Sequence, residues 1–271
     1  MKIGKYTLTV SMGMVLGLVG SLAIGSVPGH AATTPSSCLY VFAIPHADDE
    51  LLTMGMGIRQ HVNVHGGSKV CVVLMTTGEN SGVYDRLKAT EIPNLTPAQF
   101  RAARDREMWN SVLHMGVPSS NIYINGYTGP NTGVPRIFDE NNGSAVQAQA
   151  IRSWMYNTMR YFGTARHYKT MTDKSNDTGD HHAMGANLRQ LTSLYPQYVA
   201  SARYYIEPYR LGSASVSYDV VSPSATDRTQ LQKANNAYNI WNPVTWLRVG
   251  WRSVGALMQA NLNNPSSYQH S

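Results

Sequence analysis

The sequence predicts an α/β domain, a three-layer Rossmann-like fold with a mostly parallel sheet. Segments with the apolar pattern of strands alternate with segments of helical periodicity over most of the 271 residues, which is typical of parallel α/β folds. The strand-like runs at 39–44 and 70–75 are apolar at every position, as expected for strands that are covered on both faces. In such a sheet, ligands bind at the carboxyl ends of the strands, so we expect a functional site at that edge.

The individual elements are expected in the following order. After the first strand, Leu51, Gly55, Ile58 and Val62 form a helical stripe that ends near Gly66. A later helix begins at the sequence Thr-Pro-Ala-Gln over 96–99, an N-cap followed by Pro and a capping-box partner. The other expected strands are 121–124, 167–171, 203–206 and an edge strand at 217–221, and the other expected helices are 144–162, 181–194, 226–238 and 246–261.

The N-terminus has the pattern of a secretory signal peptide. Lys2 and Lys5 precede an apolar run over 8–24, and small residues surround Ala31. We therefore predict a cleaved signal peptide over 1–31 and a secreted or cell-surface protein. An uncleaved membrane helix is the alternative interpretation of the same run. No later segment is long and apolar enough to span a bilayer, so no stable membrane insertion is expected after cleavage.

Composition indicates one domain without affinity for nucleic acid. Cleavage leaves about 240 residues, enough for a single core, which we place at 38–262. The formal charge falls from +6 to about +4 when Lys2 and Lys5 are removed, and the remaining basic residues form no cluster. A nucleic-acid-binding protein would show such a cluster.

Two cysteines, Cys38 and Cys71, each open or precede an apolar run. On neighbouring parallel strands their sulfurs would lie side by side, and an exported protein meets oxidising conditions. We predict a disulfide between them. Two buried free thiols are the alternative.

The most informative segment is Pro-His-Ala-Asp-Asp-Glu at 45–50, where the first strand ends and a helix begins. A helix N-terminus favours acidic residues through its dipole, which accounts for Asp48, Asp49 and Glu50 but not for His46. A metal site is the other interpretation, and a second cluster favours it. Asp180 and His181 follow a later strand, at the same edge of the sheet.

His46, Asp49 and His181 offer two nitrogen ligands and one oxygen ligand. Hydrolytic zinc sites use such a set and leave the fourth position to water. Zinc lowers the pKa of that water, and a nearby carboxylate removes its proton. Asp48 is the spare carboxylate in this arrangement, because Asp49 is better placed beside His46.

These segments resemble the motifs of the PIG-L (LmbE-like) family of zinc-dependent N-acetylglucosaminyl deacetylases. The run His-Ala-Asp-Asp-Glu at 46–50 is similar to the family signature His-Pro-Asp-Asp-Glu, and 180–185 is similar to the second motif, His-Pro-Asp-His followed by Gly. The Gly-Glu turn at 78–79 and the Arg-x-x-Glu helix at 104–107 also match. The resemblance spans roughly 38–210, with the motifs in the family order.

The resemblance implies a role for each matched residue. It makes His46, Asp49 and His181 zinc ligands and Asp48 the general base. It places Arg104 against the substrate, with Glu79 and Asn80 on the rim of the site. It makes Asp180 an outer partner that orients a ligand.

Two positions depart from the family pattern. Ala47 replaces a Pro, and Thr178 stands where the second motif has its first His. In the family that His helps to stabilise the oxyanion of the tetrahedral intermediate, and the loss of one such donor costs about a hundredfold in rate. Thr178, His182, His167 or a backbone N–H are the candidates to replace it.

The sequence therefore predicts a zinc-dependent enzyme that removes the acetyl group from an N-acetylglucosamine-type sugar or glycoconjugate outside the cell. Two alternatives remain open: a zinc amidase acting on a non-sugar amide, and a sugar-binding protein of the same fold that has lost catalysis.

Overall fold

A computed structural model describes residues 37–78, 81–124, 137, 145–177, 179–243 and 246–271. In this part of the chain, seven strands form one sheet in the order β3-β2-β1-β4-β5-β9-β6. The first five are parallel to one another, whereas β9 is antiparallel to both of its neighbours. The mostly parallel sheet expected from the sequence is confirmed. The strands are β1 Tyr40–Ile44, β2 Val70–Leu74, β3 Ile122–Ile124, β4 Arg166–Met171, β5 Val199–Ile206, β6 Asp219–Val221 and β9 Ser267–His270.

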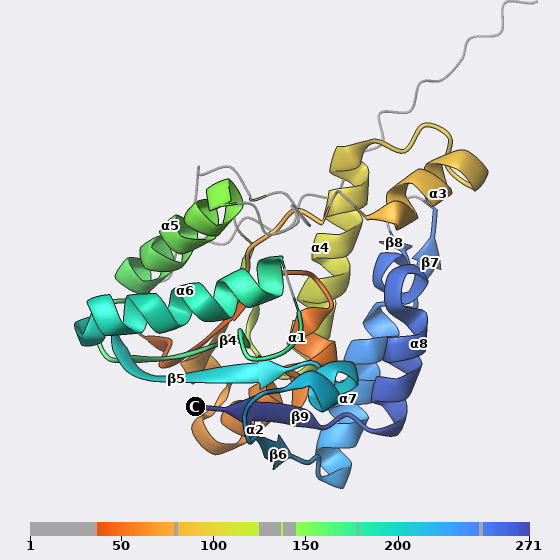
Figure 1. Cartoon of the computed structure of the whole chain (residues 1–271). Helices are drawn as coiled ribbons and strands as arrows, with labels where there is room; N and C mark the ends of the chain where they lie inside the picture. The colour runs from red at the N-terminus through yellow and green to blue at the C-terminus, as the bar shows by residue number, and fades with distance from the viewer. Residues whose placement is uncertain (1–36, 79–80, 125–136, 138–144, 178, 244–245) are drawn as a thin grey trace, which may run out of the picture.

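Helices cover both faces of the sheet, giving three layers (Figure 1). One face packs against the first helices of the chain and those on the C-terminal side, and the other packs against α5 and α6. This explains why every residue of β1 and β2 is buried. The helices are α1 Asp49–Leu52, α2 Gly55–His65, α3 Gly82–Thr90, α4 Pro97–His114, α5 Ala145–Phe162, α6 Asp180–Leu194, α7 Ala225–Ala237 and α8 Val249–Asn263.

The helix starts follow local chemistry. The Thr96 hydroxyl accepts a hydrogen bond from the Gln99 N–H, and the Gln99 side chain accepts one from the Thr96 N–H. This is the capping box that the sequence predicts for α4, with Pro97 at the first helical position. The capping box expected for α5 begins at Ser144, which lies outside the described residues.

The structure corrects the sequence analysis in three places. The segment 82–90, to which the sequence analysis assigns no helix or strand, is helix α3, and Trp246–Leu247, expected as the start of a helix, is strand β8, paired with β7 Trp241–Asn242, before α8 begins. The sheet also extends past residue 262, where we ended the domain: β9 inserts between β5 and β6. Its polar sequence Ser-Tyr-Gln-His carries no apolar run, which is why composition did not reveal it.

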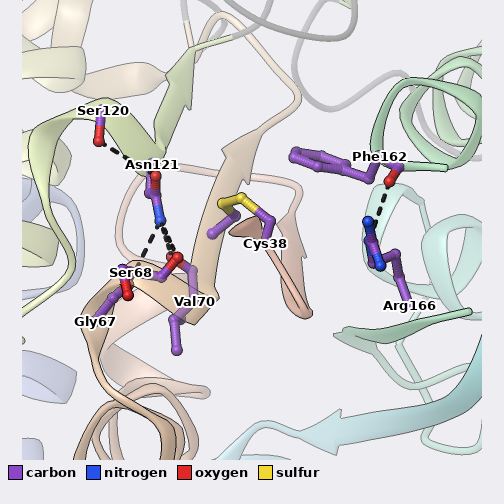
Figure 2. The surroundings of a disulfide bond; sticks show 9 residues. Cys38, Gly67, Ser68, Val70, Ser120, Asn121, Phe162 and Arg166 are labelled. Atoms are coloured by element: carbon purple, nitrogen blue, oxygen red, sulfur yellow. Dashed lines mark hydrogen bonds between the residues drawn. A yellow bond between two sulfur atoms is a disulfide. The ribbon is translucent and has the colours of Figure 1, made fainter. Parts of the chain in front are cut away.

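Cys38 and Cys71 form the predicted disulfide (Figure 2). In the sheet register Cys71 is opposite Val41, not Cys38. The bond forms because the residues before β1 approach β2, and the two Cα atoms lie 5.7 Å apart. Both sulfurs belong to the core on the α5 and α6 side of the sheet.

The predicted signal peptide, residues 1–31, lies outside the described residues. Within the described ranges, no helix combines the length and the apolar composition that crossing a bilayer requires.

Candidate metal centre and active site

The candidate site lies beside β1, where the order in which strands are added to the sheet switches from one side to the other. From β1 the chain moves to β2 and β3 on one side, and β4 then pairs with the opposite edge of β1. The loops that follow β1 and β4 therefore diverge, and they leave a crevice at the carboxyl edge. His46 follows β1, whereas Asp177, Asp180 and His181 follow β4.

His46, Asp49 and His181 converge in this crevice. His46 Nδ1 is 3.0 Å from His181 Nε2, and Asp49 Oδ2 is 3.1 Å from the same His181 nitrogen and 3.3 Å from His46 Nδ1. One ligand atom from each residue lies within 4.8 Å of the others. The three residues expected to bind a metal thus present their donor atoms to a common point.

Each imidazole is held from its other nitrogen by a carboxylate. Asp180 Oδ2 lies 3.2 Å from His46 Nε2, and Asp177 Oδ2 lies 2.5 Å from His181 Nδ1. Glu207 Oε1 is a further partner of His181 Nδ1 at 3.3 Å. Metal-binding histidines characteristically use one nitrogen for the metal and the other for a carboxylate. The residues present therefore fit a metal ion.

Asp177 and Glu207 were not among the residues selected from the sequence. Asp177 precedes His181 by four residues, and Glu207 directly follows β5, at the same edge of the sheet. Arg210 holds both carboxylates, with Nη2 3.2 Å from Asp177 Oδ1 and Nε 2.7 Å from Glu207 Oε2. The placement of Glu207 after a strand was the available signal, but its contact with His181 required the fold.

Asp180 is fixed in turn by Gln147 of α5, whose side-chain amide donates a hydrogen bond to Asp180 Oδ1. α5 and α6 pack side by side on the same face of the sheet. Packing between these two helices therefore positions the carboxylate that orients His46.

Ionisation in the centre follows from burial and close charges. Burial opposes ionisation of Asp49, but the His181 and His46 rings outweigh it and hold the pKa of Asp49 well below its usual range. Burial alone would lower the pKa of His181, but Asp49 and Asp177 raise it well above its usual value. The cluster is therefore arranged as charged pairs.

Asp48 has an unusual backbone conformation, with φ of 124°. Its N–H donates to Glu50 Oε2 at 2.9 Å, and Glu50 Oε1 accepts from the Tyr238 hydroxyl at 2.6 Å. Glu50, which the sequence analysis attributed to the helix dipole, is fully buried and holds the backbone of Asp48 in place. Burial raises the pKa of Asp48 to about 8, against the lowering effect of Arg104.

Arg104 reaches the site from α4. Its Nη1 donates to the Gly78 carbonyl at 2.9 Å and its Nη2 to the Ala47 carbonyl at 3.0 Å, with Asp48 Oδ2 at 3.8 Å. Gly78 has φ of 67°, and a Cβ there would meet Arg104 at 2.4 Å. The glycine is thus required by the turn and by the close approach of the guanidinium.

These groups line a cavity of about 330 Å³. α8 supplies another wall, and Glu107 fixes its start by accepting hydrogen bonds from the Val249 and Gly250 N–H groups at 2.8 and 3.0 Å. Arg104 and Glu107, the two residues of the Arg-x-x-Glu motif, therefore hold different walls of one cavity: Arg104 contacts the turns at Ala47 and Gly78, and Glu107 holds the start of α8. The lining residues are His46, Asp48, Asp49, Leu52, Ser81, Arg104, Asp177, Gly179, Asp180, His181, Tyr209, Arg210, Ser253, Val254 and Leu257.

Comparison with known proteins identifies the family. Residues 41–192, more than half of the chain, match the model of the PIG-L family, described as GlcNAc-PI de-N-acetylase. This chain belongs to the PIG-L family. Its members are metal-dependent N-deacetylases, and the chain is accordingly an N-deacetylase hydrolase with a site that can hold a metal. No curated protein sequence matches it.

Solved structures of deacetylases share the fold of this PIG-L protein at low identity. A zinc-inhibited teicoplanin deacetylase is 16% identical with a TM-score of 0.52, covering 85% of this chain and 98% of that chain. A deacetylase of the A40926 pseudoaglycone is 15% identical with a TM-score of 0.56, covering 86% and 98%. The N,N'-diacetylchitobiose deacetylase of Pyrococcus horikoshii is 15% identical with a TM-score of 0.52, covering 88% and 82%.

Some residues selected from the sequence lie elsewhere. Glu79, Asn80 and Thr178 are outside the described residues. Of the candidates to replace the missing histidine, His182 is exposed and does not line the cavity. His167 is in β4, where its Nδ1 is 2.8 Å from the Ser201 hydroxyl, at the amino end of the sheet.

Asp177→Asn is expected to weaken metal binding by about 10- to 100-fold, the usual effect of losing an outer partner of a metal-bound histidine. The amide keeps the size of the side chain but removes the charge that faces His181 Nδ1. Competition with a zinc chelator measures the change. Asp173→Asn, in the same loop but paired with Arg189, is the control and should bind metal as the wild type does. Equal affinity in the two variants would contradict the role of Asp177.

Proposed function

We propose that this PIG-L protein is a secreted, zinc-dependent deacetylase that hydrolyses the N-acetyl group of an N-acetylglucosamine-type sugar or glycoconjugate. The observation that carries the proposal is the convergence of His46, Asp49 and His181, with both imidazoles oriented by carboxylates. Two nitrogens and one carboxylate oxygen are the set that catalytic zinc sites use. The deacetylases of similar fold support the substrate class, since their names include teicoplanin, the A40926 pseudoaglycone and N,N'-diacetylchitobiose.

A zinc ion in this site would polarise the acetamide carbonyl and lower the pKa of a water molecule. Asp48 lines the cavity beside the metal ligands and lies next to Asp49 in sequence. Its carboxylate takes a proton from the water that adds to the carbonyl carbon. As the C–N bond breaks, the same group returns a proton to the nitrogen, so that acetate and a free amine leave. Burial raises its pKa above the usual range of an aspartate, toward the range in which one group can both accept and donate a proton near neutrality.

Arg104 and the cavity walls orient the substrate in this proposal. The Arg104 guanidinium is fixed by two carbonyls, from Gly78 and Ala47. A group held in this way presents its charge without reorganisation when the reaction occurs. Tyr209 and Arg210 line the cavity as well, and a cavity of about 330 Å³ is in the range of small-ligand sites.

Export rests on the signal-peptide pattern over 1–31, and the Cys38–Cys71 disulfide supports it, because disulfides persist in oxidising compartments. Cell fractionation and sequencing of the mature N-terminus test this part. A protein recovered wholly from the cytosol would contradict it.

Acetate release from a substrate panel tests the activity. The panel holds N-acetylglucosamine, N,N'-diacetylchitobiose, an N-acetylated glycopeptide and several N-acetylated amino acids. We expect release from the sugars, loss of release after chelation, and recovery when zinc is restored. Release from the amino acids alone would identify an amidase for non-sugar substrates. Saturable sugar binding without acetate would identify a binding protein that has lost catalysis.

A further inference from the structure

A second cavity, of about 270 Å³, lies between the end of α2 and the sheet. His61 and His65 of α2, Lys169 of β4, Arg203 of β5 and Gln269 of β9 line it. Lys169 is opposite Phe42, in the middle of β1, whereas the metal ligands lie beyond the carboxyl end of that strand. This cavity is therefore separate from the candidate active site and has no part in the proposed reaction.

Lys169 is the central charge of this cavity. Its side chain is buried, with 4% of the residue exposed. In the described part of the chain its ammonium group has no hydrogen-bond or ion-pair partner, and it lines the cavity. Buried lysines are normally paired, so a lysine with a buried side chain whose ammonium group faces only an open volume indicates room for a partner from solution.

The sheet places a second cation directly beside the first. Lys169 is opposite Arg203 in the parallel β4 and β5 register, and both side chains line the cavity. Like charges at such positions repel each other. Asp219, which the register brings opposite Gln269, forms no ion pair with either cation among the residues described. Two adjacent positive charges are thus left without a protein carboxylate.

Imidazole groups complete the lining. The Tyr40 ring stacks on His61 and His65, with centroid distances of 4.1 and 4.5 Å, and on His167 at 4.9 Å. Burial, together with Lys169 and the neighbouring histidines, lowers the pKa of His61 to about 3. At neutral pH His61 is therefore uncharged, and one of its ring nitrogens can still donate a hydrogen bond.

We propose that this cavity binds a tetrahedral oxyanion, a phosphate or a sulfate group, between Lys169 and Arg203. The donors come from two sides, because Lys169, Arg203 and Gln269 stand on the neighbouring strands β4, β5 and β9, whereas the histidines come from α2. A tetrahedral anion offers acceptors toward the sheet and toward the helix at once, whereas a carboxylate offers them in one plane. The group is supplied either by the free inorganic ion or by a phosphate ester whose substituent occupies the rest of the cavity.

Anion binding is measured by calorimetry and thermal unfolding with the zinc-loaded mature protein. Sodium phosphate, sodium sulfate and methyl phosphate are compared with sodium chloride and sodium acetate at equal ionic strength. We expect phosphate and sulfate to raise the unfolding midpoint above that in chloride or acetate. Tighter binding of methyl phosphate than of inorganic phosphate would assign the site to an ester, and the reverse order to the free ion.

Lys169→Met distinguishes anion binding in this cavity from anion binding at the metal centre, because a bound metal ion also attracts anions. The variant should bind sulfate about tenfold more weakly or worse, because a charge-assisted hydrogen bond is lost. In chloride it should unfold at a higher temperature than the wild type, because the unpaired buried charge is removed. Arg203→Gln provides a second, half-buried test site, and Lys233→Met, exposed on α7, is the control expected to behave as the wild type.

The pH dependence gives a further readout. Burial, and then Arg203, lower the pKa of Lys169 to about 8, so sulfate binding should weaken as the pH rises through this value. Sulfate itself does not titrate in this range, and Lys169→Met should show no such step. The proposal would be overturned if sulfate and phosphate stabilised the protein no more than chloride, or if the stabilisation survived unchanged in both Lys169→Met and Arg203→Gln.

Discussion

Asp48→Asn is expected to lower kcat by about a thousandfold, within the range of about 10²- to 10⁴-fold that general acid–base groups contribute. The amide has nearly the size of the carboxylate but cannot take a proton from water or return one to the amine. Asparagine also tolerates a positive φ better than most residues, so it suits the 124° conformation of residue 48. The backbone N–H that donates to Glu50 is unchanged.

Steady-state kinetics and metal analysis together test this expectation. If Asp48 acts only on the proton, the variant retains one zinc per chain, and kcat falls with little change in KM. Asp219→Asn, an exposed substitution on β6, should leave both quantities unchanged. A variant Asp48→Asn that kept its metal and worked within tenfold of the wild-type rate would remove Asp48 from the proposed mechanism.

His181→Ala is expected to abolish stable zinc binding and, with it, acetate release. In the proposed metal site His181 supplies one of the three donors, and its Nε2 lies 3.0 Å from His46 Nδ1 and 3.1 Å from Asp49 Oδ2. The loss should exceed the about 10- to 100-fold effect of removing an outer partner, because the donor itself disappears. After dialysis, the zinc content should fall from about one ion per chain to near zero.

His182→Ala is the matched control for this experiment. The residue is next in sequence, on the same first turn of α6, but it is exposed and does not line the cavity. It should keep its zinc and its activity, and circular dichroism should show that both variants fold. Retention of zinc by His181→Ala at wild-type affinity would exclude His181 as a ligand.

The sequence determined the elements whose causes are local. The apolar runs of β1 and β2 and the capping box of Thr96 and Gln99 depend on neighbouring residues, and they appear where expected. The proposed metal-binding residues could also be selected from the sequence. His46 and Asp49 are three residues apart where β1 ends and α1 begins, and the rule that parallel strands present their carboxyl ends at one edge placed His181 near them.

Only the tertiary structure decided how these residues are held. Asp177 and Glu207 orient His181, Gln147 fixes Asp180, and Glu107 starts α8. Most of these contacts join residues tens to more than a hundred positions apart, and no local periodicity encodes such a contact. The polar strand β9 and the burial of Lys169 could not be predicted from the sequence either, because strands and helices from distant parts of the chain create their environments. A sequence specifies which side chains are available, but the distances that make a carboxylate a partner of a histidine arise only when the sheet and its helices pack.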